Sequence, residues 1–324
     1  MKKSVSVILC LIILLGISAC SAAPKKELTE MSIACIKGPT GIGMAQLMNL
    51  SENSKAKGKY KFSVVSSADE ISAKIVSGEI NIASVPTNLA AKLYNKTQGK
   101  ITMLAVNTLG VLSILENGSS VKSVSDLKGK TIYSIGEGSN PEYILRHILT
   151  KNGINPDKDV KIQFVASNDE LASSVISGKA EIAMAPEPVA TKIIAKKKTV
   201  SRALSINDEW EKISDSGLMM GCVVALKSYA ESNASEIENF LEEYRQSINY
   251  ANENVAQTAA FCEKYEIIPS SALAQKAIPE CNLIFSTGAE MQNKITGYFE
   301  VLYNADKTSI GGKIPNDDFF FKGK

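Results

Sequence analysis

The stretch SADEISAKIVSGEINIASVPTNLAAK at residues 67–92 returns one hundred residues later as SNDELASSVISGKAEIAMAPEPVATK at 167–192. The two copies share Asp-Glu, Ser-Gly, Ile-Ala, a proline, an alanine and a lysine at the same offsets. Two copies are too few for a solenoid, which needs three or more repeats to bury a continuous core. They are what a protein with two similar lobes would carry.

Each copy has the pattern of a helix, a strand and a second helix. Ser67 and Ser167 each precede a glutamate by three residues, a capping box that satisfies free amides of a first helical turn. Apolar residues at i and i+4 give the helix one buried stripe. Gly78 or Gly178 follows, where a left-handed cap residue is wanted. A short run of small and branched residues then predicts a strand, and a proline ends it.

The flanking segments continue this alternation. Strands are predicted at 31–36, 131–135 and 160–165, and helices at 40–53 and from Asn140, which a proline follows. Strands that alternate with helices predict an α/β chain with mixed, mostly parallel sheets and helices on both faces.

Four loops connect a predicted strand to a predicted helix: 38–41, 86–88, 136–141 and 186–188. In α/β sheets, ligands bind beyond the carboxyl ends of strands and near helix N-termini. Two of the loops fall in each predicted lobe, so we expect a binding cleft between the lobes.

The first 19 residues have the pattern of a signal peptide. Lys2 and Lys3 precede an apolar run at 5–17, shorter than the roughly 20 residues that a spanning helix needs. The sequence ISAC at 17–20 resembles the bacterial lipobox, in which cleavage leaves an acylated cysteine at the N-terminus. We therefore expect Cys20 to carry lipid, palmitate included, and to anchor the protein at the extracytoplasmic face of the cell membrane. The alternative is plain secretion with an unmodified Cys20.

The remaining chain, with 20–27 as a tether, carries no net charge. Removal of Lys2 and Lys3 from the 36 basic residues leaves 34, against 34 acidic residues. No basic excess is left to bind nucleic acid by phosphate neutralisation.

The cysteines show no pattern of a metal site. Cys35, Cys222, Cys262 and Cys281 include no CxxC pair, and His147 is the only histidine. We expect no metal and no cofactor. Buried free thiols are favoured, with a Cys262–Cys281 disulfide as the alternative.

Three further stretches occur in a characteristic order: VSDLKGK at 124–130, LTKNGINPD at 149–157 and SGKAEIA at 177–183. Together with the lipobox, they resemble the type 2 periplasmic binding proteins, in the nitrate, taurine and thiamine-precursor branch. The resemblance covers most of the chain after the signal peptide.

This resemblance implies two lobes joined by a hinge of two crossing segments. The first lobe is expected at 28–107 plus 223–324 and the second at 112–219, with crossings at about 106–113 and 217–223. The crossings contain glycines that suit a change of φ and ψ on closure, or that serve ordinary turns. These are Gly110, Gly217 and Gly221.

The resemblance also implies a mechanism. The lobes close over a small molecule, and the closed form of a monomeric protein docks on an ABC permease that works with an ATPase. A ligand shifts such an equilibrium only by its differential affinity for the two states, so both lobes must contribute contacts.

The expected ligand-binding residues combine helix N-termini with hydrogen-bonding side chains. They are Thr40, Gly41, Thr87 and Asn88 in the first lobe, and Ser139, Asn140 and Glu187 in the second. The threonines and Asn88 are equally good as plain N-caps. Glu187 has Thr87 as its repeat counterpart, so we expect the two to face each other, unless Glu187 only complements a helix dipole.

A carboxylate in the cleft favours a ligand with N–H groups. The four loops contain no arginine or lysine. Both observations favour a small nitrogen heterocycle or amine, such as a thiamine precursor, over a sulfonate or nitrate. Two other functions stay open: an enzyme of the same fold, as in thiamine-precursor or menaquinone pathways, and a lipoprotein that presents ligand to a membrane sensor. The absence of a Ser/His/Asp set argues against the enzyme.

Overall fold

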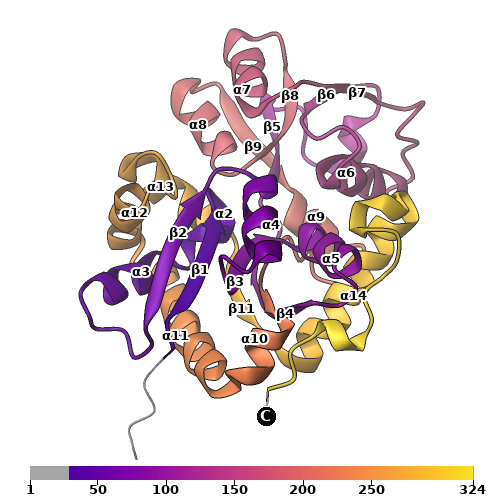
Figure 1. Cartoon of the computed structure of the whole chain (residues 1–324). Helices are drawn as coiled ribbons and strands as arrows, with labels where there is room; N and C mark the ends of the chain where they lie inside the picture. Colours follow the sequence, from indigo (N-terminus) through magenta and orange to yellow (C-terminus); the bar gives the residue numbers. More distant parts are fainter. Residues whose placement is uncertain (1–28, 324) are drawn as a thin grey trace, which may run out of the picture.

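The computed structural model describes residues 29–323, so the predicted signal peptide, Cys20 and the whole tether lie outside the described residues. Two β-sheets, each flanked by helices, form two lobes (Figure 1). The predicted α/β class with mixed, mostly parallel sheets is confirmed.

The first sheet has six strands in the order β11-β4-β10-β3-β1-β2. They are β1 (Met31–Ile36), β2 (Tyr60–Val65), β3 (Ile82–Pro86), β4 (Ile101–Thr108), β10 (Gly221–Leu226) and β11 (Leu283–Ser286). Strands β2, β1 and β3 pair in parallel, and β10 lies antiparallel between β3 and β4. Both ends of the described chain therefore contribute to this lobe.

The second sheet has five strands in the order β7-β6-β8-β5-β9. They are β5 (Leu112–Asn117), β6 (Thr131–Ser134), β7 (Lys161–Phe164), β8 (Ile182–Pro186) and β9 (Val200–Ser205). Strand β8 pairs with β6 in parallel and with β5 antiparallel. Strand β3 has the same kind of position in the first sheet, with β1 parallel and β10 antiparallel.

The repeat therefore corresponds to one unit in each lobe. Its copies are α4 (Ala68–Ser77), β3 and α5 (Thr87–Lys96), and α7 (Asn168–Ser177), β8 and α8 (Val189–Lys196). The Ser67 hydroxyl accepts from the Glu70 amide at 3.1 Å, and Ser167 accepts from the Glu170 amide at 3.2 Å. Gly78 and Gly178, at φ 79° and 86°, end the first helices in the left-handed conformation.

The other helices cover the sheets or extend the first lobe. They are α2 (Pro39–Ile42), α3 (Ala45–Glu52), α6 (Asn140–Lys151), α9 (Ile206–Glu211), α10 (Lys227–Ser232), α11 (Ala234–Glu253), α12 (Val255–Lys264), α13 (Ser271–Ala277) and α14 (Gly288–Ala305). Four 3₁₀ turns complete the set: η1 (Val124–Leu127), η2 (Ile278–Glu280), η3 (Lys307–Ile310) and η4 (Asp317–Phe319). No described helix has the length and apolar character needed to cross a bilayer.

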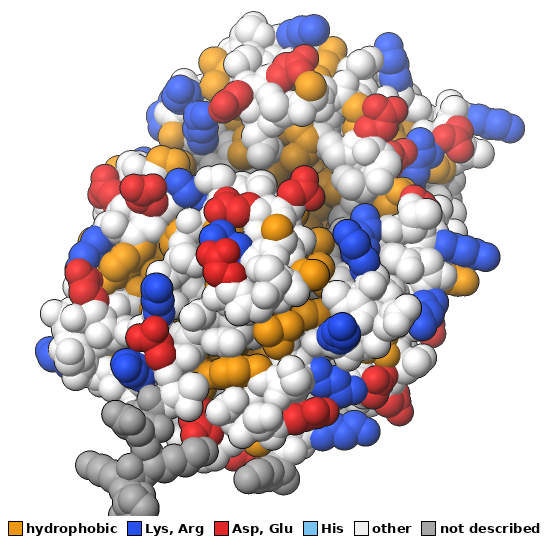
Figure 2. All heavy atoms as spheres, viewed as in Figure 1, with side chains coloured by type: hydrophobic (Ala, Val, Ile, Leu, Met, Phe, Trp, Pro, Cys, Tyr) orange, Lys and Arg blue, Asp and Glu red, His pale blue; other side chains and the backbone are white. Residues whose placement is uncertain are grey.

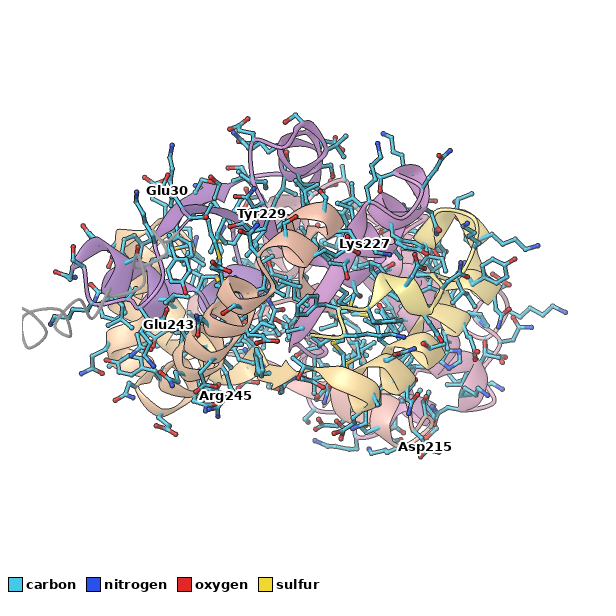
Figure 3. All side chains as sticks on the ribbon, turned by 60° about the horizontal axis from the view of Figure 1, so that its bottom comes forward. Glu30, Asp215, Lys227, Tyr229, Glu243 and Arg245 are labelled. Atoms are coloured by element: carbon cyan, nitrogen blue, oxygen red, sulfur yellow. The ribbon has the colours of Figure 1, made fainter. Side chains whose placement is uncertain are left out.

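The helix expected at 40–53 is divided into α2 and α3. The division falls at Gly43, where α11 packs so closely that a β-carbon would lie 2.8 Å from Ile248 Cγ1. Glycine is also a poor helix former. Helix α11 is held to the edge of the sheet by Glu243 (Figure 3), whose carboxylate accepts from the Lys57 amide at 2.8 Å and the Tyr60 hydroxyl at 2.7 Å.

The chain passes between the sheets at 109–111 and again at 212–220. The three glycines near these crossings do not have positive φ. Close packing explains two of them: a β-carbon on Gly110 would lie 2.6 Å from Leu218 Cδ2, and one on Gly221 would lie 2.6 Å from Asn107 Oδ1. Their role as a hinge, like the lobe boundaries, stays a prediction.

Candidate functional site

A cavity of about 380 Å³ lies between the two sheets, where strands of both lobes end. Its wall contains proline, apolar and uncharged polar residues together with two charged ones. They are Ile36, Lys37, Pro39, Thr40, Pro86, Asn88, Thr108, Val111, Ser139, Asn140, Pro141, Asn168, Pro186, Glu187, Met220 and Gly221. Figure 2 shows a hollow with hydrophobic side chains between the upper and the lower lobe.

The cavity occupies this place because four strands end there. In the first lobe β1 leads into α2 and β3 leads into α5; in the second lobe β6 leads through a loop into α6, and β8 leads into α8. Each helix N-terminus presents amides without partners in its own helix, which carry partial positive charge. The cavity is therefore suited to polar groups of a small ligand.

Five of the seven residues expected to bind ligand line this cavity: Thr40, Asn88, Ser139, Asn140 and Glu187. The other two lie behind its wall. Thr87 is fully buried, and its hydroxyl donates to the Met219 carbonyl at 2.6 Å. Gly41 is buried against Cys35 and Ile267, and its amide donates to the Gly38 carbonyl.

Glu187 is the most buried charged group of the wall, with 3% of its surface exposed. Its Oε1 pairs with Nη2 of Arg202, a residue of β9 that sequence reasoning missed. Its other oxygen, Oε2, has no hydrogen bond of ordinary geometry, but the amide and the hydroxyl of Thr191 lie within reach of the carboxylate and favour its charged form. Burial raises the pKa of Glu187 above its ordinary value, and the Arg202 guanidinium opposes that shift. Because Thr87 is buried behind the wall, it offers Glu187 no facing hydroxyl across the cavity.

Asn140 supplies a second buried acceptor. Its amide Nδ2 donates to the Tyr298 hydroxyl at 3.3 Å, whereas its Oδ1 is buried without a partner. The neighbouring Ser139 hydroxyl donates to the Gly136 carbonyl at 2.7 Å, so its oxygen is free to accept another bond. Buried polar atoms are nearly always hydrogen-bonded in native proteins. Asn140 Oδ1 and the Ser139 hydroxyl oxygen are therefore acceptors in the cavity wall that have capacity for a further donor.

Sequence reasoning also missed Lys37 and Asn168. Lys37 follows β1 directly, and its ammonium lies 3.3 Å from Glu266 at the surface, with 43% of the side chain exposed. The argument that the cleft lacks a cation was therefore incomplete. Asn168 begins α7 and replaces Ala68 of the first repeat. That exchange of an alanine for an amide was visible in the repeat.

Two larger hollows, of about 550 and 460 Å³, are lined by residues of the first lobe alone. The first lies beside the C-terminal segment, where Lys227 pairs with Asp318 at 3.0 Å (Figure 3). Neither hollow can gain contacts when the lobes approach each other. The cavity between the lobes is therefore the candidate site.

Other chemistry finds little support in the described part of the chain. No group of three or more His, Cys, Asp or Glu side chains within residues 29–323 is arranged to hold a metal ion. The four cysteines there are free and buried, as the favoured interpretation expected. Burial raises the pKa of Cys262 to about 12, which leaves it a thiol at neutral pH.

Two sheets on either side of a polar cavity at strand ends, joined by two crossings, define a periplasmic binding protein fold. The sequence profile described as "ABC transporter, phosphonate, periplasmic substrate-binding protein" matches residues 47–254, and the chain belongs to this family. It is thus the extracytoplasmic substrate-binding component of an ABC importer, and the predicted family relationship is confirmed. No curated protein matches the chain.

Solved structures share the fold at low sequence identity. An ABC transporter protein from Parabacteroides distasonis has 22% identity and a TM-score of 0.77, over 91% of this chain and 100% of that one. The aliphatic sulphonate binding protein SsuA from Escherichia coli has 16% identity and a TM-score of 0.69, over 90% and 95%. The nitrate-binding protein NrtA from Synechocystis PCC 6803 has 14% identity and a TM-score of 0.52, over 74% and 67%. The family and the Escherichia coli and Synechocystis neighbours are described as binding proteins.

Proposed function

We propose that the chain captures a small nitrogen heterocycle or amine in the cavity between its lobes and delivers it to an ABC permease. One observation carries the choice of ligand. Glu187 and Asn140, which carry acceptor oxygens, line the same cavity wall, and Asn140 Oδ1 has no donor within the described residues. A ligand with N–H donors would complement these side chains, and a buried acceptor left unpaired costs about 1–3 kcal/mol.

Closure of the lobes is the proposed way of capture. The moving units are those expected from the sequence, 28–107 plus 223–324 and 112–219. Thr40 and Asn88 contribute from the first unit and Ser139, Asn140 and Glu187 from the second. A ligand that contacts both sets has a higher affinity for the closed form, and so populates it.

An anionic ligand is the competing proposal, and Lys37 is the observation that favours it. Lys37 lines the cavity, and helix N-termini attract negative charge. The family carries phosphonate in its description, and the Escherichia coli neighbour binds aliphatic sulphonates. Against an anion stands the buried carboxylate of Glu187, which would repel a second negative charge nearby.

The remaining proposals concern location. We propose that Cys20 is acylated and holds the protein at the extracytoplasmic face of the membrane, where it supplies the permease as a monomer. Mass spectrometry of the purified N-terminal peptide would test the lipid. A lipid-free N-terminus after signal removal would contradict it. Delivery to a membrane sensor is the alternative role.

A thermal-shift screen of the chain tests the ligand. The panel contains thiamine precursors, other heterocycles, amines, sulfonates, phosphonates and nitrate. A ligand at 100 times its dissociation constant stabilises the fold by about 2.7 kcal/mol, a rise of several degrees. A saturable shift with a heterocycle or amine, reduced to about half in Glu187→Gln, supports the proposal. Shifts with anions alone, lost in Lys37→Gln, would replace it with the competing ligand class.

A further inference from the structure

The two lobes meet on two sides of the cavity, and the two contacts differ in kind. On one side α6 of the second lobe packs on α14, and on the other α8 packs on α13 (Figure 1). The helices α13 and α14 both belong to the C-terminal part of the chain, which completes the first lobe.

The α6–α14 contact is part of one continuous hydrophobic core. A single cluster of buried residues includes Ile144 and Ile148 of α6, Ile295 of α14 and Met103 of the first sheet. Trp210 also belongs to it, and its ring lies 5.6 Å from that of Tyr298. The Tyr143 hydroxyl donates to Asp306 at 2.8 Å, beside the Asn140–Tyr298 bond. Opening on this side would expose core surface to water, which is unfavourable.

The α8–α13 contact has no shared core. Ala190 and Ile193 of α8 belong to a cluster made only of second-lobe residues. Ala274 of α13 belongs to another, made only of first-lobe residues. Next to these helices, Arg202 Nε of β9 and Glu280 Oε2 of η2 form an ion pair across the lobes, 3.5 Å apart and without a hydrogen bond. Within residues 29–323 it is the ion pair that connects the two lobes; the others join groups of one lobe.

Arg202 connects this contact to the cavity. Its Nη2 binds Oε1 of Glu187 and donates to the Thr191 hydroxyl at 2.7 Å. A single guanidinium thus holds the cavity carboxylate and reaches the opposite lobe. A quarter of the Arg202 side chain and 42% of the Glu280 side chain are exposed, whereas Arg202 Nε itself is buried in this form and would be hydrated only when the lobes separate.

We propose that the lobes open on the α8–α13 side, about the shared core on the α6–α14 side, and that the Arg202–Glu280 pair stabilises the closed form. Arg202 and Glu280 are then positioning residues for the ligand. They bring the Glu187 wall of the cavity against the first lobe without touching the ligand themselves. The inference rests on the closure proposed above, but not on the identity of the ligand.

Distances between spin labels on the full chain, without ligand, test this inference. One pair of exposed positions spans the polar contact, Lys196→Cys on α8 with Gln275→Cys on α13. The other spans the shared core, Thr150→Cys on α6 with Glu300→Cys on α14. The four described native cysteines are buried, so the introduced thiols are the ones that react.

Glu280→Gln should raise the open-to-closed ratio on the α8–α13 pair by about twofold to fivefold, the effect expected of a partly exposed ion pair. The α6–α14 distance should stay unchanged. Added salt should also raise the open-to-closed ratio of the wild-type protein on the α8–α13 pair, because salt screens the Arg202–Glu280 attraction. It should have no such effect in Glu280→Gln, which lacks the Glu280 charge. Glu280→Asp should restore part of the salt response, which a merely structural role would not do.

Glu242→Gln is the matched control. It breaks the Glu242–Arg245 pair, which is similarly exposed but lies within α11, so neither distance should change. Equal lengthening on both sides, or an unchanged α8–α13 distance in Glu280→Gln, would overturn the inference. Because no ligand is used, neither result depends on the thermal-shift screen, and an empty screen would leave the distance result standing.

Discussion

At the scale of single residues, the charge of Glu187 is the feature on which the proposed choice of ligand depends. Burial raises the pKa of this carboxyl, while Arg202 favours its charged form. When the pKa of a carboxyl is higher in the folded than in the unfolded state, the group stabilises the fold at a pH below its unfolded-state pKa. This contribution is lost as the pH rises through the folded-state pKa. The ionised group is therefore costly to the empty protein. A donating ligand offsets this cost, because it binds to the ionised form.

Ligand affinity should consequently depend on pH. As pH falls through the raised pKa of Glu187, which lies above the ordinary value of about 4.3, a heterocycle or amine should bind more weakly. Glu187→Gln should remove this dependence and lower the affinity at neutral pH by roughly tenfold, an amount typical of one charged hydrogen bond. Calorimetric titration between pH 4 and 8 measures both. Affinity that rises on acidification would contradict a donating ligand.

Thr87 and Asn88 are neighbours whose substitution should have opposite consequences. Thr87→Val leaves the buried Met219 carbonyl without its donor and should lower the free energy of unfolding by about 1–3 kcal/mol, with ligand affinity little changed. Asn88→Ala removes a side chain from the cavity wall and should weaken binding with little effect on stability. Urea unfolding and ligand titration of both variants separate the two roles. A stable Thr87→Val that fails to bind would place Thr87 in the site.

At the scale of elements, the two repeat units invite a matched comparison of their helix caps. Ser67→Ala and Ser167→Ala each remove one hydroxyl that accepts a hydrogen bond from a backbone amide. Each substitution should lower the free energy of unfolding by about 1 kcal/mol. Only Ser167 adjoins a cavity residue, Asn168. We expect ligand affinity to fall in Ser167→Ala and to stay unchanged in Ser67→Ala, as measured by titration. Equal affinities in both variants would mean that Asn168 contributes nothing.

The elements that sequence reasoning predicted well are those governed by local chemistry. Caps, glycines after helices and short branched runs act within a few residues, so the repeat units and their loops were predictable. The division of the helix at 40–53 was not, because it depends on Ile248 of α11, some two hundred residues away in sequence. Arg202 was missed for the same reason: nothing in β9 indicates that its side chain reaches Glu187 and Glu280.

The candidate site could also be predicted only in part from the sequence. The rule that ligands bind at strand ends placed five of seven chosen residues on one cavity. It could not distinguish a side chain that faces the cavity from one that turns behind it, as Thr87 does. It also passed over Lys37, because the argument considered the loop at 38–41 and not the residue between that loop and the preceding strand.

At the scale of the whole molecule, the shared core has a consequence for unfolding. One hydrophobic cluster extends from Met103 of the first sheet through α14 to Ile132 and Trp210 of the second lobe. Lobes joined only by a hinge would unfold separately, whereas lobes that share a core lose it together. We therefore expect a single cooperative transition, even though each lobe has its own sheet.

The only tryptophan of the chain makes this expectation measurable. Trp210 is fully buried, and its indole Nε1 donates to the Ser216 carbonyl at 2.5 Å. Its emission reports the second lobe, while far-ultraviolet circular dichroism reports the helices of both. In urea without ligand, the two signals should give coincident transitions. Tyr298→Ala should shift both midpoints together, because loss of a buried aromatic ring costs about 3–5 kcal/mol of a core that serves both lobes. Two separate unfolding transitions, of which Tyr298→Ala shifts only the midpoint detected by fluorescence, would show that the lobes unfold independently. The contact of α14 with the second lobe would then not couple them.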